Sequence, residues 1–229
     1  MARIVNFIKK EFSGWGKGEC IIFPLVILLI IIISVFMKDK PEALVAAICG
    51  ICATILAGKG RISCYFLGMI TNLCYSYISL KNMFWGHLVL NMLYYFPMQF
   101  VGIAKWKNHF KKDTQEICKT ALTCKERILY AFVAIVFSII GYFILKKFGD
   151  LSPMIDATTT VLSIIAFVLT VKRCIEQWYV WTIVNTLNVV MWIIAFLHGS
   201  HSFAVILMWF TYLLLGLYFL REWKNELKV

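Results

Sequence analysis

Long apolar segments follow one another along almost the whole chain, separated by short charged segments. Seven of them contain no Asp, Glu, Lys or Arg, at positions 20–37, 43–58, 62–80, 82–104, 128–145, 157–171 and 177–220. The first six are close to the roughly 17–25 residues that a bilayer-spanning helix needs. The seventh has 44 residues and is interrupted by His198-Gly-Ser-His201, so we interpret it as two spans joined by a tight turn. The pattern predicts eight transmembrane helices.

The composition agrees with this prediction and excludes a soluble globule. Of the 229 residues 61% are hydrophobic and only 15% are charged, and the mean hydropathy is +0.80. Soluble domains are about 45–50% apolar and about 25% charged. We therefore expect an all-α polytopic membrane protein with no room for a separate soluble enzymatic domain.

The net charge of +11 is distributed unevenly between the two sides of the eight-span topology. The N-terminal tail, the C-terminal tail and the loops near 59, 105–127 and 172 hold 18 of the 23 Lys and Arg residues, and the opposite loops hold five. Basic residues remain on the cytoplasmic side, which predicts that both termini are cytoplasmic. The charge therefore reflects topology, and no nucleic-acid partner is expected.

The eight cysteines do not form the framework of a small secreted protein. Six lie in or at the ends of apolar spans, and Cys118 and Cys124 lie in the predicted cytoplasmic loop. Cys49 and Cys52 have CxxC spacing but lie within a span, without a second pair of ligands. Free thiols that pack as small apolar groups are the expected state, and neither a metal nor a cofactor is predicted.

Two parts of the chain resemble each other. Trp-Lys-Asn occurs at 106–108 and again at 223–225, and the same offset of 117 aligns Tyr95 with Tyr212. Pro41 and Pro153 begin corresponding spans. An odd number of helices lies between the two triplets, so they are expected to run parallel, related by an axis along the membrane normal. This is the 3+1+3 plan of SWEET proteins with an extra first helix, and it divides the chain into 1–40 (basic segment and extra helix), 41–107 (first repeat), 108–150 (loop and linker helix) and 151–229 (second repeat and tail).

Polar and aromatic residues form a stripe along the seventh span. At 100° per residue the stripe occupies an arc of about 80°. An amide that faces hydrocarbon leaves its donors and acceptors unpaired, so we favour a ligand site, while hydrogen bonding between helices and interfacial tryptophan belts remain the alternatives. The members of the stripe are Trp178, Trp181, Asn185, Asn188 and Trp192.

Two further spans carry polar faces. In the fourth span Asn91, Tyr95 and Gln99 again cover about 80°, and Pro97 removes a backbone donor and should kink this helix. In the third span Asn72 and Tyr75 are equally compatible with ligand contact and with helix packing.

The middle of the spans contains no Lys or Arg and no clear acidic residue, because Asp156 lies near an outer end. Ion-driven carriers generally use carboxylates within the membrane, so coupling to protons or sodium is not expected. No paired carboxylates, nucleophile–base set or HExxH motif is present, and an enzyme is not expected. Carboxamides, phenols and indoles suit a small hydroxylated ligand with a flat, cationic ring.

Several of these motifs resemble the PnuC family of bacterial vitamin transporters. They are the residues from Gly60 to Ser63, the Tyr-Phe-Pro-Met-Gln block that ends at Gln99, Trp106, and Gln177-Trp-Tyr-Val-Trp181 followed by Asn185. The resemblance implies a SWEET-like fold in the bacterial inner membrane and import of nicotinamide riboside by facilitated diffusion. A cytoplasmic kinase would trap the riboside as its phosphate.

The resemblance also implies roles for the polar residues. One repeat would hold the ligand through Trp178, Trp181, Asn185 and Asn188, and the other through Asn91, Tyr95 and Gln99. Thiamine, also a flat cation with a hydroxyl, is the alternative substrate, and a membrane assembly protein without transport is a more distant alternative. Formation of a homo-oligomer and the role of the first helix are left open by the sequence.

Overall fold

The computed structural model describes residues 11, 15–81, 85–107, 109, 117–147, 153–197 and 203–227. This part of the chain is built from helices, and seven of the eight predicted spans correspond to one helix each. One span is a composite in which α5 (Trp85–Val89), the π-helical segment η1 (Leu90–Tyr95) and α6 (Phe96–Lys107) follow without a break. The other helices are α2 (Glu19–Phe36), α3 (Pro41–Gly58), α4 (Ser63–Lys81), α7 (Cys124–Lys147), α8 (Pro153–Lys172), α9 (Glu176–Leu197) and α10 (Phe203–Leu227).

Five of these helices are long and apolar enough to cross a membrane by themselves, namely α2, α3, α7, α8 and the segment Val205–Leu227 of α10. The remaining three, α4, α9 and the composite helix, are those that carry Asn72, Asn185 and Asn91.

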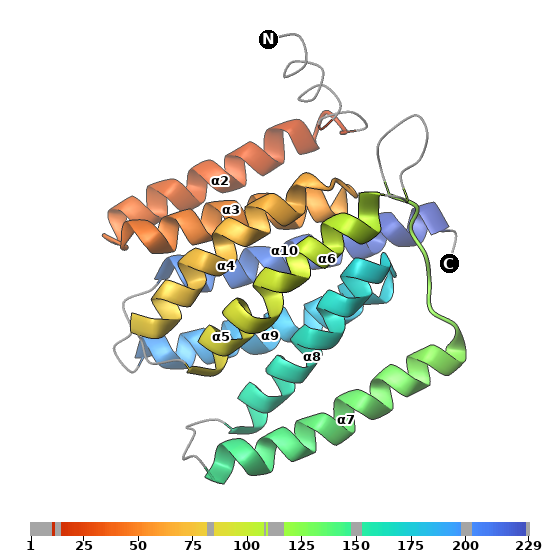
Figure 1. The fold of residues 1–229 in the computed structure, drawn as a ribbon. Coiled ribbons are helices and arrows are strands. Elements are labelled where there is room, and N and C mark those ends of the chain that lie inside the picture. The colour runs from red at the N-terminus through yellow and green to blue at the C-terminus, as the bar shows by residue number, and fades with distance from the viewer. Residues whose placement is uncertain are drawn as a thin grey trace.

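The helices form a central bundle with one further helix on each side (Figure 1). Helices α3 and α4 pack together, as do α8, α9 and α10, and the two groups meet where α10 contacts α3 and where α6 contacts α8. Helix α2 contacts α3 and α10. Helix α7 packs along α8, and within it only Ser138 is buried.

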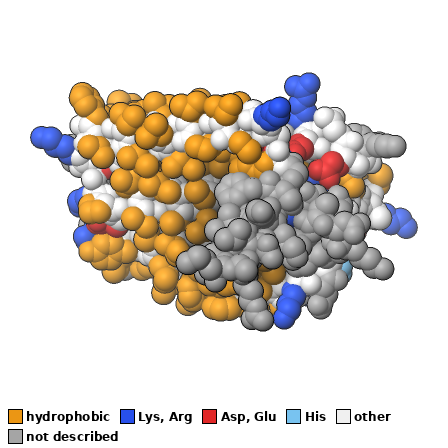
Figure 2. Space-filling model, turned by 90° about the horizontal axis from the view of Figure 1, so that it is seen from above, with side chains coloured by type: hydrophobic (Ala, Val, Ile, Leu, Met, Phe, Trp, Pro, Cys, Tyr) orange, Lys and Arg blue, Asp and Glu red, His pale blue; other side chains and the backbone are white. Residues whose placement is uncertain are grey.

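The outer surface of the bundle is apolar, as a bilayer requires. Large side chains such as Phe132, Ile135 and Phe143 of α7 are more than half exposed. Hydrophobic side chains cover much of the face shown in Figure 2, and the basic side chains lie mainly toward its two ends. This surface would be incompatible with water and matches the hydrocarbon core of a membrane.

Two short turns in different parts of the chain have the same backbone geometry. The turn from α3 to α4 contains Gly60 with φ 67°, and the turn from α8 to α9 contains Arg173 with φ 65°. The N–H of each residue donates to the carbonyl three positions earlier, in Ala57 and Thr170 respectively. A left-handed conformation is unusual for a residue other than glycine, so Arg173 adopts a strained state that Gly60 adopts without cost.

Two buried tryptophans join the helix groups across the bundle. The indole Nε1 of Trp106 on α6 donates to the carbonyl of Thr170 on α8 at 3.2 Å, and that of Trp223 on α10 donates to the carbonyl of Gly58 on α3 at 2.8 Å. Both side chains are fully buried. Helix α6 packs against α4 and so belongs to the group of α3 and α4. The Trp106 bond joins α6 to the last turn of α8, and the Trp223 bond joins α10 to the last turn of α3, so each bond connects the two groups.

Candidate functional site

A cavity of about 200 Å³ lies in the middle of the central bundle, lined by side chains of α3, α4, the composite helix, α8, α9 and α10. It brings together polar residues that are up to 158 positions apart in the chain (Thr54 to Tyr212). Nine of the ten site residues predicted from the sequence line it: Asn72, Tyr75, Asn91, Tyr95, Gln99, Trp178, Trp181, Asn185 and Asn188.

The tenth predicted residue, Trp192, does not line the cavity. Its buried indole packs against the ring of Tyr75, with the centroids 6.4 Å apart. The ring of Tyr75 also contacts His87 and Trp209 edge to face. Trp192 therefore belongs to the aromatic packing beyond one end of the cavity.

Helix α9 presents two indoles, of Trp178 and Trp181, and three carboxamides to the cavity. The Nε1 of Trp181 donates to the hydroxyl of Thr170 at 3.1 Å, which fixes the orientation of this half-buried ring. The ring of Trp178 packs between Phe219, at 5.4 Å, and Trp223, at 5.7 Å. Trp181 is thus free to offer a ring face to a ligand, while Trp178 is held in the packing of α10.

Several buried polar atoms at the cavity have no hydrogen-bond partner within the described part of the chain. They include Nδ2 of Asn72, Nε2 of Gln177, Nε1 of Trp178 and Oδ1 of Asn188. The other amide atom of Asn188, Nδ2, donates to the carbonyl of Val184 on its own helix at 2.9 Å. An unpaired buried polar atom costs about 1–3 kcal/mol. A site that keeps several donors and an acceptor in this state is suited to a polar ligand.

The composite helix positions Asn91 and Tyr95 through its π-helical segment. The N–H of Phe96 donates to the carbonyl of Asn91, five residues earlier, and this wider turn lies just before Pro97. The helix therefore has π-helical geometry directly before Pro97, a feature found often at functional sites. The amide Nδ2 of Asn91 donates to the carbonyl of His87 at 2.7 Å, so the side chain is braced against its own helix.

Two glycines make space for polar side chains at the cavity. A methyl group at Gly68 on α4 would lie 2.7 Å from Nε2 of Gln99, and one at Gly50 on α3 would overlap the hydroxyl of Tyr212. Tyr212 and Gln177 line the cavity but were not among the predicted site residues. Gln177 opens the Trp-rich motif and could have been included, whereas Tyr212 had only its alignment with Tyr95 as a signal.

The described lining residues include no Asp, Glu, Lys or Arg. Asp156 is half-buried and lies outside the lining. Helix α8 contributes neutral hydroxyls instead, from Thr159, Thr160, Ser163 and Thr170. The cavity is therefore polar without carrying a fixed charge.

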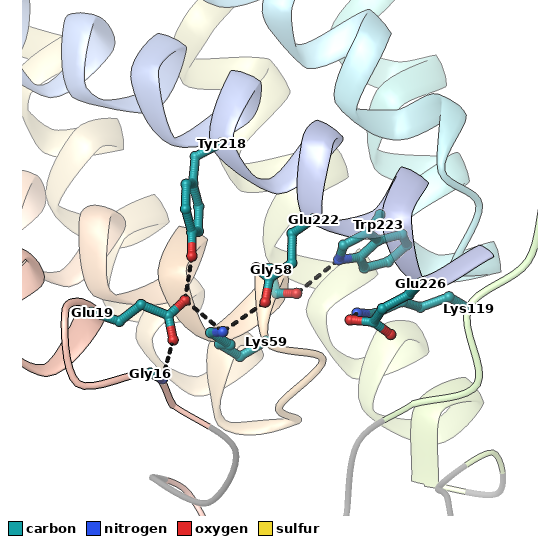
Figure 3. Close-up of polar contacts among 9 residues, drawn as sticks. All are labelled: Gly16, Glu19, Gly58, Lys59, Lys119, Tyr218, Glu222, Trp223 and Glu226. Carbon is teal, nitrogen blue, oxygen red and sulfur yellow. Dashed lines mark hydrogen bonds and ion pairs between the residues drawn. The ribbon is translucent and has the colours of Figure 1, made fainter. Parts of the chain in front are cut away.

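Buried charges occur instead at the end of the bundle where α3 leads into α4, which we call the Lys59 end. The ammonium of Lys59 contacts the carboxylates of Glu19 at 2.6 Å and Glu222 at 2.7 Å, and the hydroxyl of Tyr218 donates to Glu19 (Figure 3). Burial alone would lower the pKa of Lys59, but the hydrogen bonds and charges of the two glutamates outweigh it and raise that pKa. Lys59 thus stays charged and ties α2, α3 and α10 together.

An all-helical, multi-pass membrane protein with a neutral cavity of amides and aromatic rings at its centre has the architecture of a small-molecule transporter. Residues 41–225 match the family model described as nicotinamide mononucleotide transporter. The chain belongs to this family, which is known from its curated members as the PnuC transporters and is a family of transporters rather than enzymes.

Individual relatives cover nearly the whole chain. The nicotinamide riboside transporter PnuC of Neisseria mucosa is 34% identical over 226 residues, which are 96% of this chain and 86% of that protein. The protein of the same name from Haemophilus influenzae is 30% identical, covering 96% of both chains. A crystal structure of the vitamin B3 transporter PnuC superimposes with a TM-score of 0.86 at 33% identity, covering 96% of both chains.

Proposed function

We propose that this protein imports nicotinamide riboside across the bacterial inner membrane by facilitated diffusion. The observation that carries the proposal is the neutral central cavity, in which amides, phenols and the half-buried indole of Trp181 converge. The riboside combines a flat pyridinium ring, a carboxamide and ribose hydroxyls. The ring face of Trp181 suits the cationic ring. The unpaired amide atoms of Asn72, Gln177 and Asn188 suit the carboxamide and hydroxyls.

The same cavity favours the riboside over its phosphorylated form. A phosphate is usually bound by arginine, lysine or a cluster of backbone N–H groups, and neither basic residue is among the described lining residues. Burying a phosphate dianion here would leave its charge uncompensated. A cytoplasmic kinase that phosphorylates the riboside would therefore trap it in the cell.

We also propose that residues 41–107 and 151–229 are two parallel repeats, preceded by residues 1–40 and separated by residues 108–150. The matching turns at Gly60 and Arg173 and the reciprocal indole bonds of Trp106 and Trp223 support a pseudo-twofold relation. Because α7 alone lies between the triplets, their helices run in the same direction, and a cavity at the interface of such repeats is where transporters bind their substrates.

A binding titration tests the substrate assignment. Purified protein is titrated calorimetrically with nicotinamide riboside, nicotinamide mononucleotide and thiamine. We expect the riboside to bind at least about tenfold more tightly than the mononucleotide, because the phosphate lacks a cationic partner. Thiamine as the tightest ligand would transfer the proposal to that vitamin. Binding of none of the three would favour an assembly protein whose polar residues serve helix packing.

A liposome assay tests the transport mechanism. Because the described cavity residues carry no carboxylate, riboside uptake should reach equal concentrations inside and outside under any pH or sodium gradient. Enclosing a riboside kinase and ATP should convert this equilibration into continued uptake. Accumulation driven by an ion gradient and lost in Asp156→Asn would overturn facilitated diffusion.

Thiol labelling tests the proposed orientation. Cys118 and Cys124 are exposed and lie on the segment that the charge distribution places in the cytoplasm. A membrane-impermeant maleimide should label them in inverted vesicles but not in intact cells. Labelling from outside the cell would reverse the orientation.

A further inference from the structure

A second cavity, separate from the central one, lies between the extra helix α2 and the two helices that it contacts, α3 and α10. Its volume is about 760 Å³, within the range of sites that hold small molecules, and it shares no lining residue with the central cavity. We call it the α2 groove. Apart from one threonine its length is apolar, formed by Phe23, Val26, Leu29, Ile30 and Ile33 of α2, Ile51 and Ile55 of α3, and Leu207, Phe210, Leu214 and Leu215 of α10.

The α2 groove is long and has its polar end at the membrane interface. On α2 its lining runs from Glu19 to Ile33, which at 1.5 Å per residue is roughly 21 Å. On α10 it runs from Glu222 back to Leu207 over a similar distance. The hydrocarbon core is about 30 Å thick, so one leaflet occupies about half of that. A groove of this length follows one acyl chain from the interface into the hydrocarbon.

The charged side chains that line the polar end of the groove are two carboxylates and one ammonium, so the lining carries a net negative charge. Glu19 and Glu222 are two carboxylates that share the single ammonium of Lys59, and Tyr218 donates its hydroxyl to Glu19 (Figure 3). Only Oε1 of Glu222 contacts Lys59, and its Oε2 is buried without a hydrogen-bond partner in the described part of the chain. A buried carboxylate oxygen in this state favours a hydrogen-bond donor that carries positive charge.

A basic residue, Lys17, lies next to this polar end of the groove. Gly16 and Gly18 line the mouth of the groove, and Lys17 between them is exposed. The mouth thus offers one acceptor for a headgroup ammonium and one ammonium for a headgroup phosphate.

We propose that the α2 groove binds phosphatidylethanolamine, with one acyl chain along α2, the headgroup ammonium at Glu222 and the phosphate near Lys17. The zwitterionic headgroup places each charge beside its opposite. An anionic headgroup such as phosphatidylglycerol offers no cation to Glu222, and the choline headgroup offers a cation that has no N–H to donate. The lipid would complete the packing of α2 against α3 and α10.

Native mass spectrometry with defined lipids tests this proposal. Delipidated protein is incubated with dioleoyl-phosphatidylethanolamine, -phosphatidylglycerol or -phosphatidylcholine, and retained lipid is measured after gas-phase activation. We expect one retained molecule of the ethanolamine lipid, preferred over the other two by about fivefold, because a partly exposed ion pair contributes little more. Equal retention of all three lipids would overturn the headgroup assignment, and retention of none would overturn the site.

Two variants and a matched control locate the site. Glu222→Gln should abolish the preference for the ethanolamine lipid, while Glu226→Gln, one turn further along α10 and paired with Lys119 outside the groove, should keep it. Leu214→Trp fills the groove from the half-exposed position of Leu214 and should prevent retention of any of the three lipids. A preference that survives both groove variants in protein that melts cooperatively would place the lipid elsewhere and overturn the proposal.

Discussion

Helices α4 and α9 follow turns of the same geometry, yet they present different side chains to the cavity. Counting from the left-handed residues Gly60 and Arg173, the register pairs Tyr65 with Trp178, Asn72 with Asn185 and Gly68 with Trp181. The first two pairs keep an aromatic ring and a carboxamide at matching depths. In the third pair α4 has no side chain where α9 has an indole.

The third helices of the two groups, α6 and α10, differ in the opposite sense, because here the group of α3 and α4 has the large side chain and the group of α8, α9 and α10 has the glycine. The register that pairs Trp106 with Trp223 also pairs Gln99 on α6 with Gly216 on α10. Gln99 occupies the space that Gly68 leaves open, since a methyl group there would lie 2.7 Å from its amide. Each group thus supplies one large side chain at this level, an amide from α6 and an indole from α9.

The difference between the two groups matches the ligand proposed above. A symmetric frame of turns and indole bonds would by itself create two equal half-sites. Replacing one pair by amide and glycine and the other by glycine and indole places the amide of Gln99 on one side of the cavity and the indole of Trp181 on the other. Nicotinamide riboside is likewise unequal at its two ends, with hydroxyls on the ribose and a cationic ring at the other end.

The largest expected loss of riboside affinity comes from Asn72 and Asn185, the pair of carboxamides that both groups contain. Asn72→Leu and Asn185→Leu should each weaken riboside binding by up to about a hundredfold, because a ligand polar group left unpaired costs about 1–3 kcal/mol. Asn72→Leu should also raise the melting temperature of the ligand-free protein, since it removes an unpaired buried Nδ2. Calorimetry and thermal melts measure both effects. Lower stability with unchanged affinity would show that Asn72 serves helix packing.

The indole side of the cavity should contribute less. Trp181→Ala should reduce riboside affinity by about tenfold, because a desolvated cation–π contact is worth about 1–2 kcal/mol. Trp181→Phe should restore part of the loss. Thr170→Val is the matched control, since it removes only the hydroxyl that orients the indole, at 3.1 Å from its Nε1. Wild-type affinity in Trp181→Ala would place the ring of the ligand elsewhere.

Much of the site could be predicted because helical periodicity places residues on one face without knowledge of the fold. The stripe on α9 gave Trp181, Asn185 and Asn188 in this way. Periodicity does not report depth along the helix axis, and Trp192, seven residues beyond Asn185, lies about 10 Å further along in aromatic packing. Tyr212 was missed because its place at the cavity depends on tertiary packing against α3.

Most helix ends were predictable to within about four residues, although α10 continues seven residues beyond the charge-free segment that ends at 220. The charge-free segments 43–58 and 62–80 correspond to Pro41–Gly58 and Ser63–Lys81, since charged residues at the ends of apolar runs mark where a helix leaves the hydrocarbon. The α2 groove gave no signal in the sequence. The sequence does not distinguish an apolar side chain that faces lipid from one that faces a neighbouring helix or a cavity between helices.

Replacing Gly68 or Gly216 by alanine should distinguish the two groups by a smaller change in riboside affinity. Gly68→Ala should weaken riboside binding by about fivefold, because the new methyl group displaces the flexible end of Gln99 and costs about one hydrogen bond. Gly216→Ala should leave binding unchanged, since its methyl group would meet only Thr182 and Asn185 at ordinary contact distances of 3.5 and 3.8 Å. It should also stabilise α10 by up to about 1 kcal/mol. Equal losses of affinity in both variants would contradict the inverse arrangement of amide and indole.

The smallest effect is expected where the two groups are most alike. Trp106→Phe and Trp223→Phe each remove one buried hydrogen bond to a carbonyl, to Thr170 and Gly58 respectively. Each loss should cost about 1 kcal/mol, which lowers the melting temperature by about 2–4 °C for a chain of this size. The two shifts should be equal within error, because both indoles are fully buried and make the same kind of bond. The double variant should show their sum if the bonds act independently. A shift in one variant several times larger than in the other would show that the two contacts are not equivalent, and the pseudo-twofold relation between the groups would lose its strongest structural support.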